Sequence, residues 1–581
     1  MTPASVSYYT DEVAGGLEDY YAGRGEAPGR WLGRGSASAG LAREVSADQL
    51  ARLFAAEHPA TEEPLGALYR VRAGADRVTG WDLTFSAPKT VSVLWAVGGG
   101  HIGMEVREAH EAAVAAGVAY LDEHAAFSRQ GKAGIRQVDT DGLVAAGFVH
   151  RSSRAGDPQL HTHVLVSGRV RCGDGVWRAL DSRALHRELK TAGMLYQAAL
   201  RAELTARLGV TWGPVDRNGQ ADLVGVPAGL TTHWSKRRAA VRARAAERIA
   251  AAETEQGRSL TPQERRRAHE VAALETRTAK SHEETSGAGL HDHWAAEAAA
   301  LGFPAASWLA DTVDRDLARP AMSLEVVVAD TLAELQESAS TWGRTDVVRH
   351  AARRAPTSLG GADDVARWVE HVADLVLADP AVVRLAAPAT TPPVDLRRRD
   401  GRSVFEPHGA PRFATAVTVD QEQRVVDLVT AGRGVRRSVA APEAVEIAVA
   451  AGSLDEDQAV AVRRVTLDGD AVSCVIGPAG TGKSRTMGAA ANAWTASGVP
   501  VRGLAVSAAA AGVLQAEAGI GSETTAKFLF EHDRPGGPSS SWSLRPGEVV
   551  VVDEAGMVTS ADLARIVALA HQSQAKVVLV G

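Results

Sequence analysis

Residues 157–166 read DPQLHTHVLV and place two histidines, His161 and His163, one residue apart in a stretch with the pattern of a β-strand. Side chains alternate between the two faces of a strand, so both imidazoles point to the same side. Upstream, GLVAAGFVH ends in His150, and the RSSRAGDPQL between them carries a glycine and a proline typical of a turn. We therefore expect a hairpin that brings the three histidines together on one face.

Three imidazoles on one face predict a binding site for a divalent metal that keeps open coordination positions. Imidazole accepts several such ions, so the pattern leaves the choice between Mg²⁺, Mn²⁺ and Zn²⁺ open. The alternative is a sheet face whose histidines simply bond to backbone carbonyls. The sequence pattern favours the metal site because the histidines converge from both arms of the expected hairpin.

Bulk properties exclude several classes of protein. The net charge of −7 excludes a general polyanion-coating protein, so any contact with nucleic acid must come from local patches. No apolar run is long enough to span a bilayer, and no signal peptide opens the chain. The two cysteines, Cys172 and Cys474, are far apart, which fits the reducing cytoplasm of a bacterium rather than a disulfide framework.

The 581 residues are enough for several domains. Strand-like and helical runs alternate at the N-terminal end, which predicts an α+β domain with a central antiparallel sheet, followed by a helical middle region and a partial α/β P-loop domain. The basic helical segment at 236–280 has either a solvated face or, as the less favoured alternative, a DNA-backbone contact. The expected boundaries are 1–300 for the first domain, 301–386 for a helical region, 387–402 for a linker, 403–453 for a connecting region and 454–581 for the P-loop domain.

Two tyrosine pairs, Tyr8-Tyr9 and Tyr20-Tyr21, hold four of the seven tyrosines in the chain. A phenol that loses its proton is a usable nucleophile, and a metal that polarises a phosphoryl oxygen makes the phosphorus electrophilic. Together they would cut DNA by forming a phosphotyrosine link and a free 3′-OH. The alternative, an aromatic patch packed on a core, explains two pairs in a tyrosine-poor chain less well.

The segments YY…YYAGRGEAPGRWLGRG, GWDLTFSAPKTVSVLW and His150…DPQLHTH resemble the N-terminal domain of MobF-class conjugative relaxases of the TrwC/TraI type, which are His-hydrophobe-His (HUH) endonucleases. The resemblance covers roughly residues 8–300. It implies site- and strand-specific nicking of single-stranded or hairpin DNA at a transfer origin, with accessory conjugation proteins and a coupling protein as partners. It further implies a metal bound by His150, His161 and His163, Tyr8 as the first nucleophile and Tyr20 as a second one used at termination.

Other residues carry less defined roles. The resemblance gives Asp82, in GWDLTF, a role in assisting the tyrosine or orienting a histidine, with a plain surface carboxylate as the alternative. Lys89, in SAPKTVS, is a candidate phosphate contact. The sequence does not distinguish the roles of Tyr9 and Tyr21 from those of the neighbouring Tyr8 and Tyr20. The chain departs from its relatives in having only MTPASVS before Tyr8, where they carry a short strand.

Residues 471–486, AVSCVIGPAGTGKSRT, contain a phosphate-binding loop of the form G-x-x-x-x-G-K-[ST] between a strand and a helix. Backbone amides of such a loop surround the phosphates of ATP, the lysine reaches the β and γ oxygens, and the hydroxyl binds Mg²⁺. The predicted ATP site consists of Gly477, Pro478, Ala479, Gly480, Thr481, Gly482, Lys483 and Ser484.

Downstream, EVVVVDEAGM ends a strand in Asp553 and Glu554, which we expect to hold Mg²⁺ and to orient the attacking water. Gln458 lies where superfamily-1 helicases of the RecD/TraI type, which this part of the chain resembles, carry an adenine-reading glutamine. An ordinary exposed glutamine on a helix is the alternative. The resemblance makes this region an incomplete RecA-like helicase lobe.

Helicases of this type continue beyond the point where KVVLVG ends this sequence, with a second lobe and an arginine finger. Either the sequence is a fragment of a longer relaxase–helicase, or its helicase domain is truncated, and in both cases we expect no unwinding or robust ATPase activity from these residues. Two alternatives to a relaxase remain: a fragment of an ATP-dependent helicase, and a non-catalytic DNA-binding remnant.

Overall fold

The structure is a computed structural model that describes residues 29–41, 44–66, 78–153, 155–257, 259–276, 287–314, 322–385, 391–478 and 480–581. The described residues form two compact units. The first comprises those within Met1–Leu332, Gly343–Ala378 and Ala386–Arg412, and the second those within Ala333–Trp342, Asp379–Leu385 and Phe413–Gly581. None of the described helices combines the length and the apolar character needed to cross a membrane.

The first unit is built on a four-stranded sheet in the order β1-β5-β6-β2. Every neighbouring pair in it is antiparallel, as the sequence predicts. The long strands β5 and β6 form the expected hairpin, in which His150 is the cross-strand partner of His161. These strands are β1 (Arg30–Leu32), β2 (Gly80–Ser86), β5 (Ala145–Ser152) and β6 (Pro158–Ser167).

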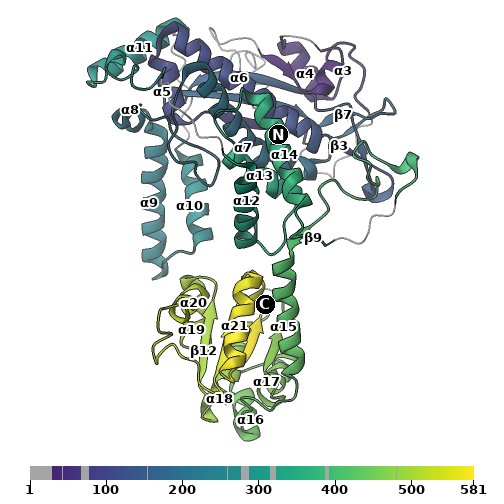
Figure 1. The fold of residues 1–581 in the computed structure, drawn as a ribbon, viewed down its shortest axis with the longest axis vertical. Helices are drawn as coiled ribbons and strands as arrows, with labels where there is room; N and C mark the ends of the chain where they lie inside the picture. The colour runs from purple at the N-terminus through teal and green to yellow at the C-terminus, as the bar shows by residue number, and fades with distance from the viewer. Residues whose placement is uncertain are drawn as a thin grey trace. The chain divides into compact units, whose positions relative to one another are not determined.

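A layer of three helices covers one face of this sheet (Figure 1). They are α5 (Lys89–Val97), α6 (Gly99–His124) and α7 (Ser182–Leu208). Along β6, Leu160 and Val164 are fully buried, whereas His161 and His163 on the opposite face are only partly buried. The period-two alternation therefore separates an apolar face packed on helices from a face that carries the histidines.

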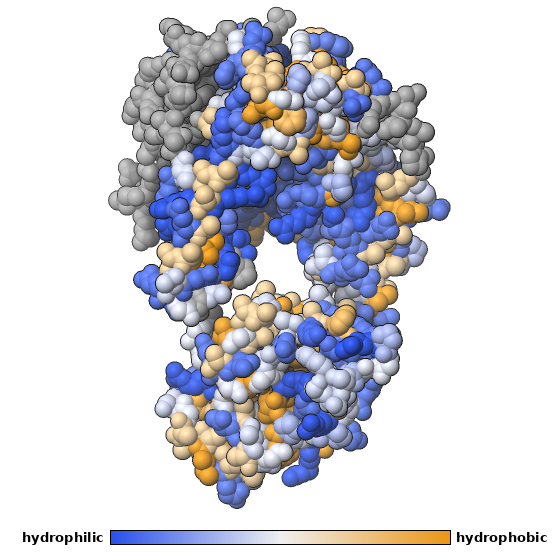
Figure 2. All heavy atoms as spheres, turned by 90° about the vertical axis from the view of Figure 1, so that its left-hand side faces the viewer, coloured by the Kyte–Doolittle hydropathy of each residue, from blue (hydrophilic) through white to orange (hydrophobic). Residues whose placement is uncertain are grey.

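Smaller elements complete the first unit. The basic segment forms two exposed helices, α9 and α10, separated at Gly257, which ends α9 in a left-handed conformation. The face of the first unit seen in Figure 2 is largely hydrophilic. These elements are α3 (Arg34–Ser38), α4 (Ala47–Ala55), β3 (Phe127–Gln130), β4 (Arg136–Asp139), β7 (Arg169–Arg171), β8 (Trp177–Ala179), α8 (Ala228–His233), α9 (Lys236–Gln256), α10 (Pro262–Glu275) and α11 (Gly287–Ala300).

The structure differs from the expected boundaries between residues 343 and 412. Helices α13 (Arg344–Arg354) and α14 (Ala362–Ala378) pack on α7. Residues 391–402, the described part of the expected linker at 387–402, belong to the same unit, as do residues 403–412 of the expected connecting region. The buried guanidinium of Arg398 donates to Gln137 at 3.3 Å and lies 5.7 Å from the Phe127 ring centroid. Composition alone predicts a linker here because it does not reveal partners as distant in the chain as Gln137 and Asp139, which accept hydrogen bonds from the Arg398 side chain and the Arg399 backbone amide.

The second unit contains a parallel sheet in the order β11-β15-β14-β12-β13, flanked by helices, in agreement with the predicted α/β class. All four residues of β14, a run of valines, are buried, as expected for an inner strand of a parallel sheet. Its elements are α12 (Leu324–Ser338) in part, β9 (Val382–Arg384), β10 (Phe413–Thr415), α15 (Ala416–Ala431), α16 (Pro442–Ala451), α17 (Glu456–Leu467), β11 (Val472–Val475), α18 (Lys483–Ala496), β12 (Val501–Ala505), α19 (Ala508–Ala518), β13 (Ser522–Thr524), α20 (Thr525–His532), β14 (Val549–Val552), α21 (Ser560–Gln572) and β15 (Lys576–Val580).

Candidate functional site

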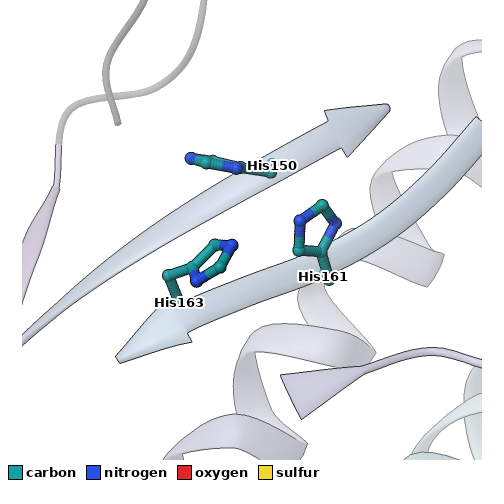
Figure 3. A group of neighbouring side chains, drawn as sticks. All are labelled: His150, His161 and His163. Atoms are coloured by element: carbon teal, nitrogen blue, oxygen red, sulfur yellow. The ribbon is translucent and has the colours of Figure 1, made fainter. Parts of the chain in front are cut away.

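The structure brings His150, His161 and His163 together on one face of the β5–β6 hairpin (Figure 3). The ring centroids are 5.2 Å apart for His150 and His161, 4.9 Å for His150 and His163, and 5.2 Å for the two histidines of β6. One ligand nitrogen from each ring lies within 4.8 Å of the others. Three nitrogens at this separation can be drawn onto one ion by small rotations of the rings.

The hydrogen bonds of the two β6 histidines define their tautomers. His161 Nδ1 lies 2.8 Å from the backbone carbonyl of Gln159, and His163 Nδ1 lies 2.8 and 3.0 Å from the two carboxylate oxygens of Asp82. Carbonyl and carboxylate oxygens only accept, so in each ring Nδ1 carries the hydrogen. This tautomer keeps the lone pair on Nε2, which is how metal-binding histidines are usually held. The donor set fits a divalent metal.

Asp82 lies on β2 beside His163, and its side chain is 21% exposed. Of the two roles that the resemblance implies for it, this position supports the orientation of a histidine. Thr84, two residues along the same face of β2, places its hydroxyl 3.4 Å from the same Nδ1. Sequence reasoning missed Thr84 and Gln159. The alternation along β2 could have indicated Thr84, whereas Gln159 acts through its backbone carbonyl and leaves no signal in the sequence.

Lys89, at the start of α5, donates from Nζ to the carbonyl of Pro158 at 2.7 Å and so ties the helix to the beginning of β6. Burial lowers the pKa of Lys89 to about 8, although the nearby Asp157 carboxylate raises it. A cleft of about 510 Å³ is lined by Lys89 together with Arg238 and Arg242 of α9. Asp216 and Asp222 line the same cleft, and the contact of Lys89 with a phosphate stays a prediction.

The nucleophile candidates Tyr8, Tyr9, Tyr20 and Tyr21 lie outside the described residues, as does Ala479 of the phosphate loop. Their roles therefore stay predictions. The described part of the site supplies the candidate metal ligands and the groups that orient them.

In the second unit the phosphate loop connects β11 to α18, as the motif predicts. Gly480 and Gly482 have φ angles of +79° and +73°, a left-handed conformation that glycine adopts without strain. The ammonium of Lys483 donates to the carbonyl of Gly477 at 2.7 Å and lies 3.2 Å from that of Pro478. The lysine therefore folds back over the loop in which phosphates would lie.

Gln458, in the first turn of α17, donates from Nε2 to the carbonyl of Thr481 at 2.9 Å. This bond places the glutamine at the phosphate loop, while its Oε1 accepts from the Asp455 amide in the capping box of α17, so its role toward a nucleotide stays a prediction. Asp553 and Glu554 follow β14, and burial raises the pKa of the Asp553 carboxyl. The Glu554 amide donates to Asp553 at 3.0 Å, which fixes one carboxylate oxygen at the strand end.

Comparison with known sequences gives two matches along the chain. The sequence model of the TrwC relaxase family matches residues 3–301, which is more than half of the chain, and that of an AAA domain family matches residues 453–581. The second match and the parallel sheet agree on a P-loop domain.

Individual relatives are longer proteins. The multifunctional conjugation protein TraI of Escherichia coli is 32% identical over 286 residues, which are 48% of this chain but 14% of TraI. A probable conjugal transfer protein TraA of Sinorhizobium fredii is 39% identical over 137 residues, or 22% of this chain and 11% of the relative. The solved structure of the conjugative relaxase TrwC in complex with oriT DNA, in its metal-free form, is 28% identical, with a TM-score of 0.42, and the match covers 50% of this chain and 96% of TrwC. Since the family model spans more than half of the sequence, the chain belongs to the TrwC relaxase family.

Proposed function

We propose that the first unit is a DNA relaxase, which nicks one strand at a transfer origin and stays covalently attached to the cut end during conjugative transfer. The observation that carries the proposal is the cluster of His150, His161 and His163, with both β6 rings oriented through Nδ1. The names of the relatives, conjugation proteins and a relaxase bound to oriT DNA, support the same reaction and substrate.

In the proposed reaction the phenolic oxygen of Tyr8 attacks the phosphorus of one phosphodiester. A Tyr–O–P bond forms, the P–O3′ bond breaks, and the phenolic proton ends on the leaving 3′ oxygen. The products are a phosphotyrosine link to the 5′ end and a free 3′-OH. Because the phosphotyrosine bond conserves the energy of the phosphodiester, the strand can be rejoined later. Tyr20 would act in this second strand transfer at termination. His150, His161 and His163 would hold a divalent metal that acts as a Lewis acid on the scissile phosphate.

Single-stranded oligonucleotides tiled across the replicon that encodes the chain test this proposal. The proposal predicts that, with Mg²⁺ or Mn²⁺, one oligonucleotide yields a shorter product with a 3′-OH and a protein–DNA band that survives denaturation. Cleavage without any covalent band would indicate a hydrolytic nuclease, and no cleavage of any oligonucleotide would favour a non-catalytic DNA-binding protein.

Replacing Asp82 with Ala should weaken metal binding by about 10- to 100-fold, the usual cost of losing a hydrogen-bond partner behind a metal-binding histidine. The variant leaves the three imidazoles in place but removes the acceptor that fixes the tautomer of His163. The dependence of nicking on Mn²⁺ concentration measures the effect. Asp82→Asn keeps an oxygen acceptor and should lose less. If the alanine variant shows the wild-type Mn²⁺ dependence, the orienting role is wrong.

For the second unit we propose binding of ATP with Mg²⁺ at the phosphate loop from Gly477 to Ser484, with Asp553 on the magnesium side and Gln458 near the base. The position of Lys483 over the loop supports this role. Lys483→Ala should weaken MgATP binding by about 10- to 100-fold, because hydrogen bonds to charged groups are worth about 1.5–3 kcal/mol each. Titration with a fluorescent ATP analogue measures it. Lys527→Ala, which removes a lysine of α20 from the same unit, is the matched control; equal affinity of both variants would contradict the assignment.

A further inference from the structure

The residue between the two β6 histidines, Thr162, points to the opposite face of the sheet. It is 3% exposed and lies under the helical layer, with Phe85 of β2 and Val149 of β5 as its cross-strand partners. Both cross-strand neighbours are apolar and offer no hydrogen-bond partner. A hydroxyl at this point needs a hydrogen-bond partner.

That partner is a buried histidine of α6. Thr162 Oγ1 lies 2.7 Å from His110 Nε2, and His110 Nδ1 lies 2.8 Å from the hydroxyl of Tyr196 on α7. His110 is 0% exposed and Tyr196 is 1% exposed. A continuous polar chain therefore runs from α7 through α6 to the middle of the strand that carries two candidate metal ligands.

The protonation state of His110 is consistent with these hydrogen bonds. Burial, together with the nearby His161 and Arg107, lowers the pKa of His110 to about 3, so the ring is neutral at neutral pH. A neutral imidazole has one N–H donor and one acceptor nitrogen. Each hydroxyl can serve as either donor or acceptor, so both ring nitrogens are satisfied. A buried network in which both ring nitrogens are bonded favours one arrangement of the elements that it joins.

The hydrogen bonds from Tyr196 through His110 to Thr162 oppose rotation of the β6 backbone about its long axis. Because Thr162 is bonded to both ligand residues through single peptide units, a twist at 162 swings His161 and His163 together relative to His150. The apolar packing of Leu160 and Val164 resists displacement of the strand, but apolar contacts are non-directional. The bond from Thr162 to His110 is directional, with its far end held by Tyr196.

We infer that His110 is a positioning residue for metal binding, which acts through Thr162 to hold the imidazoles of His161 and His163 at the height and angle where they meet His150. The inference rests on the metal site proposed above. It goes beyond that site by assigning a function to a buried histidine that lies outside the candidate ligand cluster and outside the sequence motifs.

The test is a titration of the metal-free full chain with Co²⁺, in which binding is measured by calorimetry and by the visible absorption of the bound ion. Thr162→Val keeps the shape of the side chain and removes the hydroxyl. It should weaken Co²⁺ binding by about tenfold, the lower end of the range for residues that hydrogen-bond behind metal ligands, and it should change the absorption spectrum. Thr162→Ser keeps the hydroxyl and should restore both. Tyr196→Phe leaves the bond between Thr162 and His110 intact and should have a smaller effect.

Loss of stability is separated from loss of position by the triple variant T162V/H110F/Y196F. It replaces the whole polar chain by apolar groups, which leaves no buried group unsatisfied, so its thermal unfolding should be close to that of the wild type. Its Co²⁺ affinity should nevertheless remain about tenfold lower. Wild-type affinity and spectrum in a folded T162V or triple variant would overturn the inference. If the wild-type chain itself binds no Co²⁺ at the histidines, the proposed metal site fails instead.

Discussion

Replacing His161 or His163 with alanine should abolish nicking, and the variant should still bind its DNA. The expected fall in the single-turnover rate is at least about 10³-fold, because a metal that polarises a phosphoryl oxygen supplies several kcal/mol and each 1.4 kcal/mol corresponds to a factor of ten. Both side chains are only partly buried, so their removal leaves no large cavity in the core. A labelled oligonucleotide that contains the nick site measures cleavage and binding in parallel.

His101→Ala is the matched control for this prediction. Its side chain is 75% exposed on α6 and does not belong to the cluster, so the variant should nick at the wild-type rate. His150 is less suitable as the primary test because it is 5% exposed, and its loss would affect packing as well as metal binding. Nicking at the wild-type rate by either the His161 or the His163 variant would show that the cluster has no role in the reaction.

Tyr8→Phe should eliminate the covalent protein–DNA adduct. The substitution removes a single oxygen atom, which is the proposed nucleophile, so folding and DNA binding should be unchanged. Tyr9→Phe is the matched control at the neighbouring position and should retain the adduct. Tyr20→Phe should spare the first nick and impair a second strand transfer, which a two-oligonucleotide exchange assay detects. Adduct formation by the Tyr8 variant at the wild-type level would assign the nucleophile elsewhere.

The local pattern of the sequence was sufficient for the histidine cluster. The spacing of His161 and His163 and the turn that precedes them define one strand face, and strand periodicity fixes the direction of the side chains. The phosphate loop could be predicted for a similar reason, since its glycines and lysine act within one short segment. In both cases the chemistry and the conformation are encoded by neighbouring residues.

Features that depend on distant partners could not be predicted in this way. Thr162 occupies the middle position of the His-hydrophobe-His motif, where an apolar residue is expected. Only the structure shows that it shares a hydrogen bond with His110, 52 residues earlier in the chain. Residues 387–402 have the composition of a linker, but Arg398 is buried against β4 and Phe127. Sequence composition reports how a segment interacts with water and with its neighbours, and it does not report a polar partner supplied by another element.

The most direct measurement of the proposed relaxase reaction is mass spectrometry of the trapped covalent adduct. The full chain is incubated with Mn²⁺ and the cleaved oligonucleotide, denatured and digested with a protease and a nuclease. The proposed mechanism predicts a nucleotide joined through its 5′ phosphate to Tyr8, absent when His161 is replaced by alanine. A nucleotide found on Tyr9, Tyr21 or a residue other than tyrosine, or an adduct that forms equally well without the histidine cluster, would contradict it.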